Sequence, residues 1–189
     1  MVINLLFKKL TSMENKFLFL SKKNSDIKKK TLLEICKIKD VFWKHGIKTQ
    51  YDWVKKKLKK EDIHNLVYYN NNLIGYNLLR KRKFYLGNKK QNYFYFDTLI
   101  IHPKFRKQKI SLFLMKLNHD IFKKFRLHSF LICQKKHELF YRKFNWTKIN
   151  NKNFSIEDHK FLKKKYIGMI CNFNHSIITR KKIYFSDKI

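Results

Sequence analysis

The stretch of residues 96–115 contains the residue pattern with the clearest chemical meaning. An apolar run ends at Pro103, a basic turn follows, and an amphipathic pattern begins at Ile110. A helix that begins directly after such a turn leaves its first backbone amides unpaired, and the helix dipole adds partial positive charge there. The turn itself supplies three cations, Arg106, Lys107 and Lys109. The pattern predicts an anion site that suits a diphosphate, and a solvated basic loop is the alternative that the pattern alone leaves open.

A second run, residues 139–146, carries another recognisable pattern. It reads LFYRKFNW, and helical spacing places Phe140 and Phe144 one turn apart. Asn145 suits the left-handed conformation with which many helices end. The run therefore predicts a short helix that carries Tyr141.

Together the two segments resemble the GNAT acyltransferase superfamily. The first is similar to the family's fourth strand and pyrophosphate loop, which reads Arg or Gln, two residues, Gly, one residue, and Gly or Ala. Arg106 matches the first position, Lys109 stands where glycine is usual, and Ser111 takes the small position. The second segment is similar to the family's helix ending FYxKxGF, with Asn145 at the glycine and Trp146 at the final aromatic position.

The resemblance implies that acetyl-CoA, or another acyl-CoA, is the co-substrate and that no metal takes part. The pantetheine arm would lie against the backbone of the fourth strand, and the diphosphate would bind in the loop. At Lys109 the side chain would either crowd the diphosphate or point away from it and add charge. Carried over position by position, the donor-binding residues are Leu99, Ile100, Ile101, Arg106, Lys107, Gln108, Lys109, Ile110 and Ser111.

Two residues are candidates for catalysis. In the family an amine attacks the thioester directly, so a base must take a proton and the leaving thiolate needs one. Tyr141 matches the family tyrosine that serves the departing sulfur; as a structural residue it would be a half-buried aromatic. Asp97 is the candidate base because it is the only acid in the central apolar strand, and burial of a carboxylate there costs free energy that a functional role would explain. Its structural alternative is a hydrogen bond to a backbone amide.

The order of predicted elements is β-α-α-β-β-β-α-β-α-β, which indicates a mixed α/β fold. Hydrophobic periodicity and turn residues place strands at 17–20, 66–69, 73–79, 93–101, 130–133 and 166–173, and helices at 26–44, 50–60, 110–125 and 138–144. Residues 146–149 are a candidate for the start of a further strand. Residues 155–158 resemble a capped helix start. With the resemblance, this order predicts a GNAT-like central mixed sheet flanked by helices.

A single domain over residues 1–189 is expected from the length. Within it, residues 1–91 would form the acceptor side, 92–149 the donor-binding core and 150–189 the C-terminal strands. The acceptor pocket would lie between the first two helices and the loops near residues 81–91.

The composition favours a packed protein with a strongly basic surface. Hydrophobic residues make up 44% of the chain, too many for a disordered polycation, and the formal net charge is +32. The chain has no alanine and far more lysine than arginine, a compositional bias that would raise the charge whatever the function. Three scattered cysteines offer neither a disulfide framework nor a zinc site, and no apolar run is long enough to span a membrane. A cytoplasmic location is expected.

The acceptor is expected to be a primary amine on a small molecule, a peptide or a tRNA-linked amino acid, and the sequence identifies it no further. Two alternatives stay open. One keeps the fold but uses acyl-carrier protein as the donor, since that acidic partner would suit a basic face. The other is a non-catalytic nucleic-acid-binding protein, although no nucleic-acid motif is present. Nucleic-acid binding is expected to be weak, non-specific and steeply dependent on salt.

Overall fold

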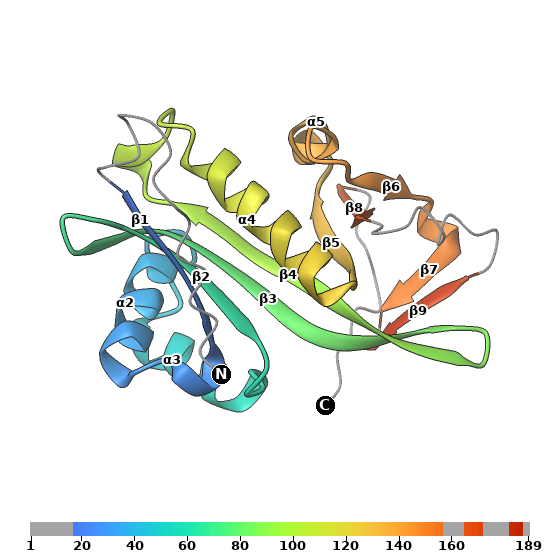
Figure 1. Ribbon diagram of the computed structural model, residues 1–189, viewed down its shortest axis with the longest axis horizontal. Coiled ribbons are helices and arrows are strands. Elements are labelled where there is room, and N and C mark those ends of the chain that lie inside the picture. Colours follow the sequence, from blue (N-terminus) through green and yellow to red (C-terminus); the bar gives the residue numbers. More distant parts are fainter. Residues whose placement is uncertain (1–16, 157–164, 172–181, 187–189) are drawn as a thin grey trace. The chain divides into compact units, whose positions relative to one another are not determined.

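The computed structural model describes residues 17–156, 165–171 and 182–186 of the chain (Figure 1). The chain divides into two compact units, Met1–Arg80 with Thr98–Leu114, and Lys81–Asp97 with Met115–Ile189. Strands pair in the order β1-β2-β3-β4-β5-β8-β6, while β9 pairs with both β3 and β7. The predicted architecture, a mixed α/β fold with a central mixed sheet flanked by helices, is confirmed, and most of the strand pairs are antiparallel. Among the described residues, no helix is long and apolar enough to cross a membrane.

The first unit is an antiparallel sheet with two helices packed on it. Its elements are β1 (Phe17–Lys23), α2 (Lys29–Asp40), α3 (Ile47–Lys57), β2 (Ile63–Tyr69), the first part of β3 (Asn72–Leu86), the end of β4 (Lys89–Ile101), a 3-10 turn η2 (Pro103–Phe105) and the start of α4 (Ile110–Phe125). The β2–β3 turn uses Asn70 and Asn71 at φ 46° and 61°, the left-handed conformation that the asparagine cluster predicts.

Both faces of this part of the sheet are covered. On one face, α2 packs its apolar stripe against β2, β3 and β4, and the buried cluster comprises Ile35, Ile38, Leu66, Tyr76, Leu78 and Ile100. Leu20 of β1 packs against the same cluster, and α2 and α3 lie side by side there (Figure 1). Phe19 points to the opposite face, where its ring lies 5.7 Å from that of Phe113 in α4. The loop between β4 and α4 is therefore attached to a packed scaffold.

The second unit contains the start of β4 and the rest of α4. Its other elements are β5 (His128–Gln134), α5 (Glu138–Arg142), β6 (Thr147–Ile149), β7 (Phe154–Ile156), β8 (Tyr166–Cys171) and β9 (Ile183–Ser186), with 3-10 turns at Lys135–His137 and Asn151–Asn153. β5 runs parallel to β4 and antiparallel to β8. β9 runs antiparallel to the end of β3 and parallel to β7.

Aromatic side chains dominate the core of the second unit. The rings of Phe130 and Phe185 stack with centroids 3.8 Å apart, within a buried cluster that also contains Phe84, Tyr93 and Phe154. The neighbouring β4 residue, Phe94, points the other way and contacts Phe122 and Phe125 of α4. Packing on both faces therefore holds β4 in place at Tyr93 and Phe94, the residues at which β5 pairs with it.

Three local predictions are corrected. Residues 81–86 and 89–91 belong to the strands β3 and β4, so the expected loop near 81–91 shrinks to a turn at Gly87 and Asn88. Ser155 and Ile156 lie in β7 rather than at a helix start, and the remainder of that expected helix start, 157–158, lies outside the described residues. In β4, side chains at alternate positions from Tyr95 to Ile101 are only partly buried, whereas burial on both faces was expected.

Candidate active site

The loop between β4 and α4 has an unusual backbone for its sequence. Lys107 and Lys109 adopt φ 71° and 58°, in the left-handed region that favours glycine. The carbonyl of Lys109 accepts hydrogen bonds from the amides of Leu112 (2.9 Å) and Phe113 (3.4 Å), so α4 begins directly after it. The amides of Ile110 and Ser111, which lie between Lys109 and Leu112, precede the first intrahelical hydrogen bond and are available to an anion.

Aromatic contacts hold this loop in place. The ring of Phe105 lies 5.3 Å from that of Tyr69 and 6.0 Å from that of His102. The amide of His102 donates to the carbonyl of Ile74 in β3 at 2.8 Å. The loop is therefore anchored to β2 and β3 immediately before its cations begin.

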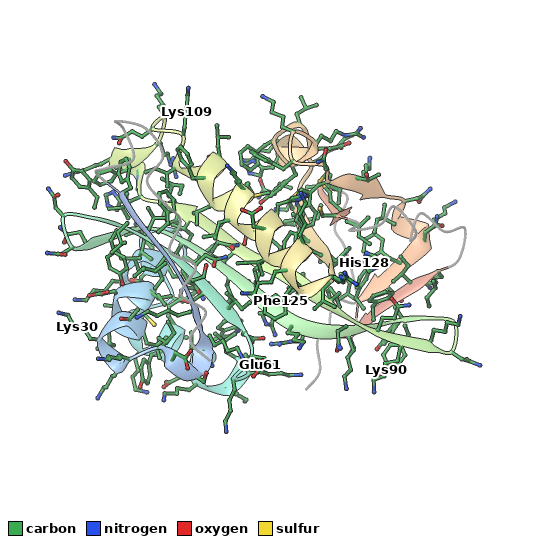
Figure 2. The ribbon with its side chains drawn as sticks, viewed as in Figure 1. Lys30, Glu61, Lys90, Lys109, Phe125 and His128 are labelled. Carbon is green, nitrogen blue, oxygen red and sulfur yellow. The ribbon has the colours of Figure 1, made fainter. Side chains whose placement is uncertain are left out.

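The cations of the loop face solvent. Arg106, Lys107, Gln108 and Lys109 are all exposed, and none of the three cations forms an ion pair with a residue that the structure describes. Figure 2 shows the Lys109 side chain extending outward from the loop. The exposed Lys109 side chain thus adds positive charge to the surface of the loop. The Arg106 guanidinium carbon lies 5.4 Å from the centre of the Phe42 ring, a contact that no sequence pattern indicates.

In the predicted donor-binding strand, residues 99–101, the backbone rather than the side chains would contact the donor. Ile100 is buried in the core and faces α2, while Leu99 and Ile101 are partly buried. Just before them, the carbonyl of Thr98 accepts a hydrogen bond from Asn77 Nδ2 at 2.6 Å. Asn77 is itself bonded to Asn65, so side-chain amides in the core support this part of β4.

In the second unit, α5 lies where β4 and β5 separate. Their pairing covers Tyr93–Tyr95 and ends there. The next residue, Phe96, meets the ring of Tyr141 edge-on at 5.9 Å and that of Trp146 at 5.6 Å. Tyr141 therefore lies beside the point where the pairing of β4 with β5 ends.

The surroundings of Tyr141 keep its phenol protonated. Burial raises the pKa of this side chain above its usual range, and the nearby Cys133 thiol raises it further. The helix α5 is held by Glu138, whose Oε1 accepts from Arg142 Nε at 2.9 Å. Asn145 follows at φ 61°, the left-handed ending that its sequence position predicts. A neutral phenol is therefore available as a proton donor at any physiological pH.

The second catalytic candidate, Asp97, faces away from this phenol, whereas the nearby Cys133 is part of the core. Asp97 follows Phe96 in β4, so strand alternation directs its partly buried side chain to the face opposite Tyr141. Cys133 is buried with its Sγ 3.9 Å from Met169 Sδ, and burial followed by the charge of Glu138 raises its pKa to about 11. Such a thiol is a core residue rather than a nucleophile. Within the described residues, no group of His, Cys, Asp and Glu side chains could hold a metal ion.

Comparison with known families decides the identity of this fold. The model of the GNAT acetyltransferase family matches residues 32–171, which is most of the chain. The chain belongs to the GNAT acetyltransferase family. No curated protein matches it in sequence.

Solved structures agree with this assignment at the level of fold. Escherichia coli ElaA is 15% identical with a TM-score of 0.63, and the match covers 82% of this chain and 98% of that one. YhbS from Escherichia coli, solved in complex with CoA, is 10% identical with a TM-score of 0.63 over 90% and 89% of the two chains. Arabidopsis thaliana Naa50, in complex with the bisubstrate analogue CoA-Ac-MVNAL, is 17% identical with a TM-score of 0.53 over 80% and 96%.

The backbone of the loop explains why GNAT proteins usually have glycine where this chain has Lys109. A residue at φ 58° places its Cβ close to its own carbonyl, which costs about 1–2 kcal/mol for most side chains and nothing for glycine. The departure from the family motif therefore carries a local backbone strain at Lys109.

Replacement of that lysine by glycine should stabilise the protein. We expect Lys109→Gly to raise the free energy of unfolding by about 1 kcal/mol, measured by urea denaturation. Lys104→Gly is the matched control, because it removes the same exposed charge at a position without positive φ and should be neutral or destabilising. Equal effects of the two variants would contradict the strain at Lys109.

Proposed function

We propose that this protein is an acyl-CoA-dependent N-acyltransferase, which moves an acetyl or other acyl group to a primary amine of an acceptor. The observation that carries the proposal is the Arg106–Ser111 loop, where exposed cations and unpaired helix amides follow the fourth strand of a GNAT fold. A diphosphate suits this site because helix amides bind its oxygens and the cations balance its charge. The CoA present in the YhbS structure supports the same donor class.

The transfer needs two proton movements. The neutral amine attacks the thioester carbonyl carbon to form a C–N bond, and the tetrahedral intermediate then expels the CoA thiolate as the C–S bond breaks. The amine nitrogen loses one proton to a base, and the thiolate gains one from an acid, so charge and atoms balance. We assign the acid to Tyr141, whose phenol is held neutral by burial. We assign the base to Asp97 acting through an ordered water, because its side chain points to the face of β4 opposite Tyr141.

The acceptor class that we propose is a small-molecule or peptide amine. The Naa50 neighbour is bound to an analogue that joins CoA to a peptide, which makes N-terminal peptide amines a first class to test. Turnover of acetyl-CoA with a panel of peptides and polyamines, followed by thiol release, would identify the acceptor. Acyl-carrier protein as the donor keeps the same chemistry, and the two donors differ in the group that lies beyond the phosphate.

The donor loop can be tested without knowing the acceptor. We expect acetyl-CoA to bind with its diphosphate at the loop, and Arg106→Ala to weaken binding by roughly 1–3 kcal/mol through loss of a charge-assisted hydrogen bond. Isothermal titration calorimetry at low salt measures both. Lys124→Ala removes an exposed charge from the last turn of α4 and should leave the Kd nearly unchanged. Absence of binding by the wild-type protein at millimolar acetyl-CoA would refute the proposed donor site.

A further inference from the structure

The segment that joins α2 to α3 exposes a large aromatic side chain. Val41, Trp43 and Ile47 are 48%, 43% and 38% exposed. The backbone beneath the indole is nevertheless well held. The amide of Trp43 donates to the carbonyl of Lys39 at 2.9 Å, and its carbonyl accepts from the Gln50 side chain at 3.0 Å. An indole presented on a fixed backbone loses little entropy when a flat ligand stacks on it.

This indole adjoins the donor loop. The guanidinium of Arg106 lies 5.4 Å from the Phe42 ring, and the Phe42 ring lies 6.3 Å from that of Trp43. The three side chains form a row in which one aromatic ring separates the loop cation from the exposed indole. Phe42 is partly buried against the α2 core and so fixes the middle of the row.

We propose that Trp43, in the segment between two helices that the sequence assigned to the acceptor side, is instead a binding subsite for the adenine of the acyl-CoA donor. This inference rests on the proposed function, because it takes the diphosphate to lie at Arg106. In CoA the adenosine is joined to the diphosphate through its ribose, so a diphosphate at Arg106 leaves the purine within reach of the adjoining indole. Stacking of a base on an exposed aromatic ring is a substantial contact and needs no hydrogen-bond pattern. Lys44, the next residue along the chain, is also exposed and adds positive charge to this segment.

The proposed adenine subsite distinguishes acyl-CoA from acyl-carrier protein, the two donor classes that share the same transfer chemistry. Acyl-CoA carries adenosine beyond its diphosphate, whereas the phosphopantetheine arm of an acyl-carrier protein carries none. An indole that stacks on the purine adds affinity for the CoA thioester alone. The row from Arg106 to Trp43 therefore points to a free acyl-CoA as the donor.

The test compares two ligands with three variants. Acetyl-CoA and acetyl-phosphopantetheine are titrated into wild type, Trp43→Ala, Trp43→Phe and the neighbouring control Val41→Ala, each by calorimetry. Trp43→Ala should weaken acetyl-CoA binding about 5- to 150-fold, the range expected for one lost stack, and leave acetyl-phosphopantetheine binding unchanged. Trp43→Phe should retain most of the affinity because it keeps an aromatic face. Val41→Ala should alter neither Kd.

Fluorescence gives a second readout. Acetyl-CoA should quench part of the wild-type emission from the three tryptophans, and Trp43→Phe should abolish that part. Unchanged acetyl-CoA affinity in Trp43→Ala would refute the adenine subsite without affecting the proposed function. Failure of the wild-type protein to bind acetyl-CoA would refute both the subsite and the proposed function. Quenching of Trp43 by single-stranded RNA more strongly than by acetyl-CoA at physiological salt would also overturn the subsite, in favour of nucleic acid.

Discussion

Tyr141→Phe should lower kcat by roughly 100-fold or more and leave the Kd for acetyl-CoA almost unchanged. The substitution keeps the ring that packs edge-on against Phe96 and Trp146, and it deletes only the hydroxyl. If the phenol protonates the departing thiolate, the loss appears in the chemical step alone. Because burial raises the pKa of this phenol, wild-type kcat should also show no loss from its ionisation below about pH 10.

Steady-state turnover and calorimetry separate the two effects. Tyr184→Phe is the matched control, since it removes a hydroxyl from an exposed tyrosine on β9 and should leave kcat and Kd unchanged. Far-ultraviolet circular dichroism and a melting curve establish that the Tyr141 variant is folded. Unaltered turnover in a folded Tyr141→Phe protein would mean that Tyr141 is a packing residue of the aromatic core and not the catalytic acid.

The elements that the sequence predicts best are those whose signals are local. The helix expected at 110–125 has those limits in the structure, because its apolar residues recur at helical spacing over its whole length. The turn between β2 and β3 is equally local, since Asn70 and Asn71 accept the left-handed backbone that the turn requires. The same holds for Asn145 after α5. In each case the residue type and its immediate neighbours determine the backbone.

Pairing between distant segments was not predictable. Strand β9 was missed because four residues carry little periodicity, and its partner in β3 lies almost a hundred residues earlier in the chain. Strand β7 was taken for a helix start because Ser155 resembles a cap, yet its backbone pairs in parallel with β9. Such short strands depend on their partners rather than on their own propensity.

The donor loop was located from its residue types, but the backbone conformation and the tertiary contacts that hold it were not predicted. Left-handed lysines are uncommon, so nothing in the residue types indicated φ 58° at Lys109. The helix expected at 26–44 would have turned Val41 toward the core. In the structure α2 ends at Asp40, and Val41 is exposed. The contact between Phe42 and Arg106 joins segments far apart in the chain and is tertiary in origin.

A buried histidine should make the stability of the protein fall steeply in acid. His64 in β2 is fully buried, and its two ring nitrogens lie 3.0 Å from Tyr76 Oη and 3.1 Å from Asn24 Oδ1. The neutral ring satisfies both partners by accepting from the phenol and donating to the amide oxygen. Burial, and then the charge of Lys39, lower the pKa of this imidazole from 6.5 to about 3. Protonation in the folded state would therefore place an extra charge in the core.

The sign of the pH dependence follows from the two protonation states. Between pH 6.5 and about 3 the unfolded chain binds a proton at His64 and the folded chain does not, so the stability present above pH 6.5 is lost as the pH falls. One proton of difference corresponds to about 1.4 kcal/mol per pH unit. Urea denaturation between pH 7.5 and 4 should show this extra slope in wild type relative to His64→Gln, which keeps a donor and an acceptor but does not titrate. Carboxylates titrate alike in both proteins, so the difference isolates the imidazole. Equal slopes, with the variant folded at pH 7.5, would mean that His64 takes up its proton in the folded state after all.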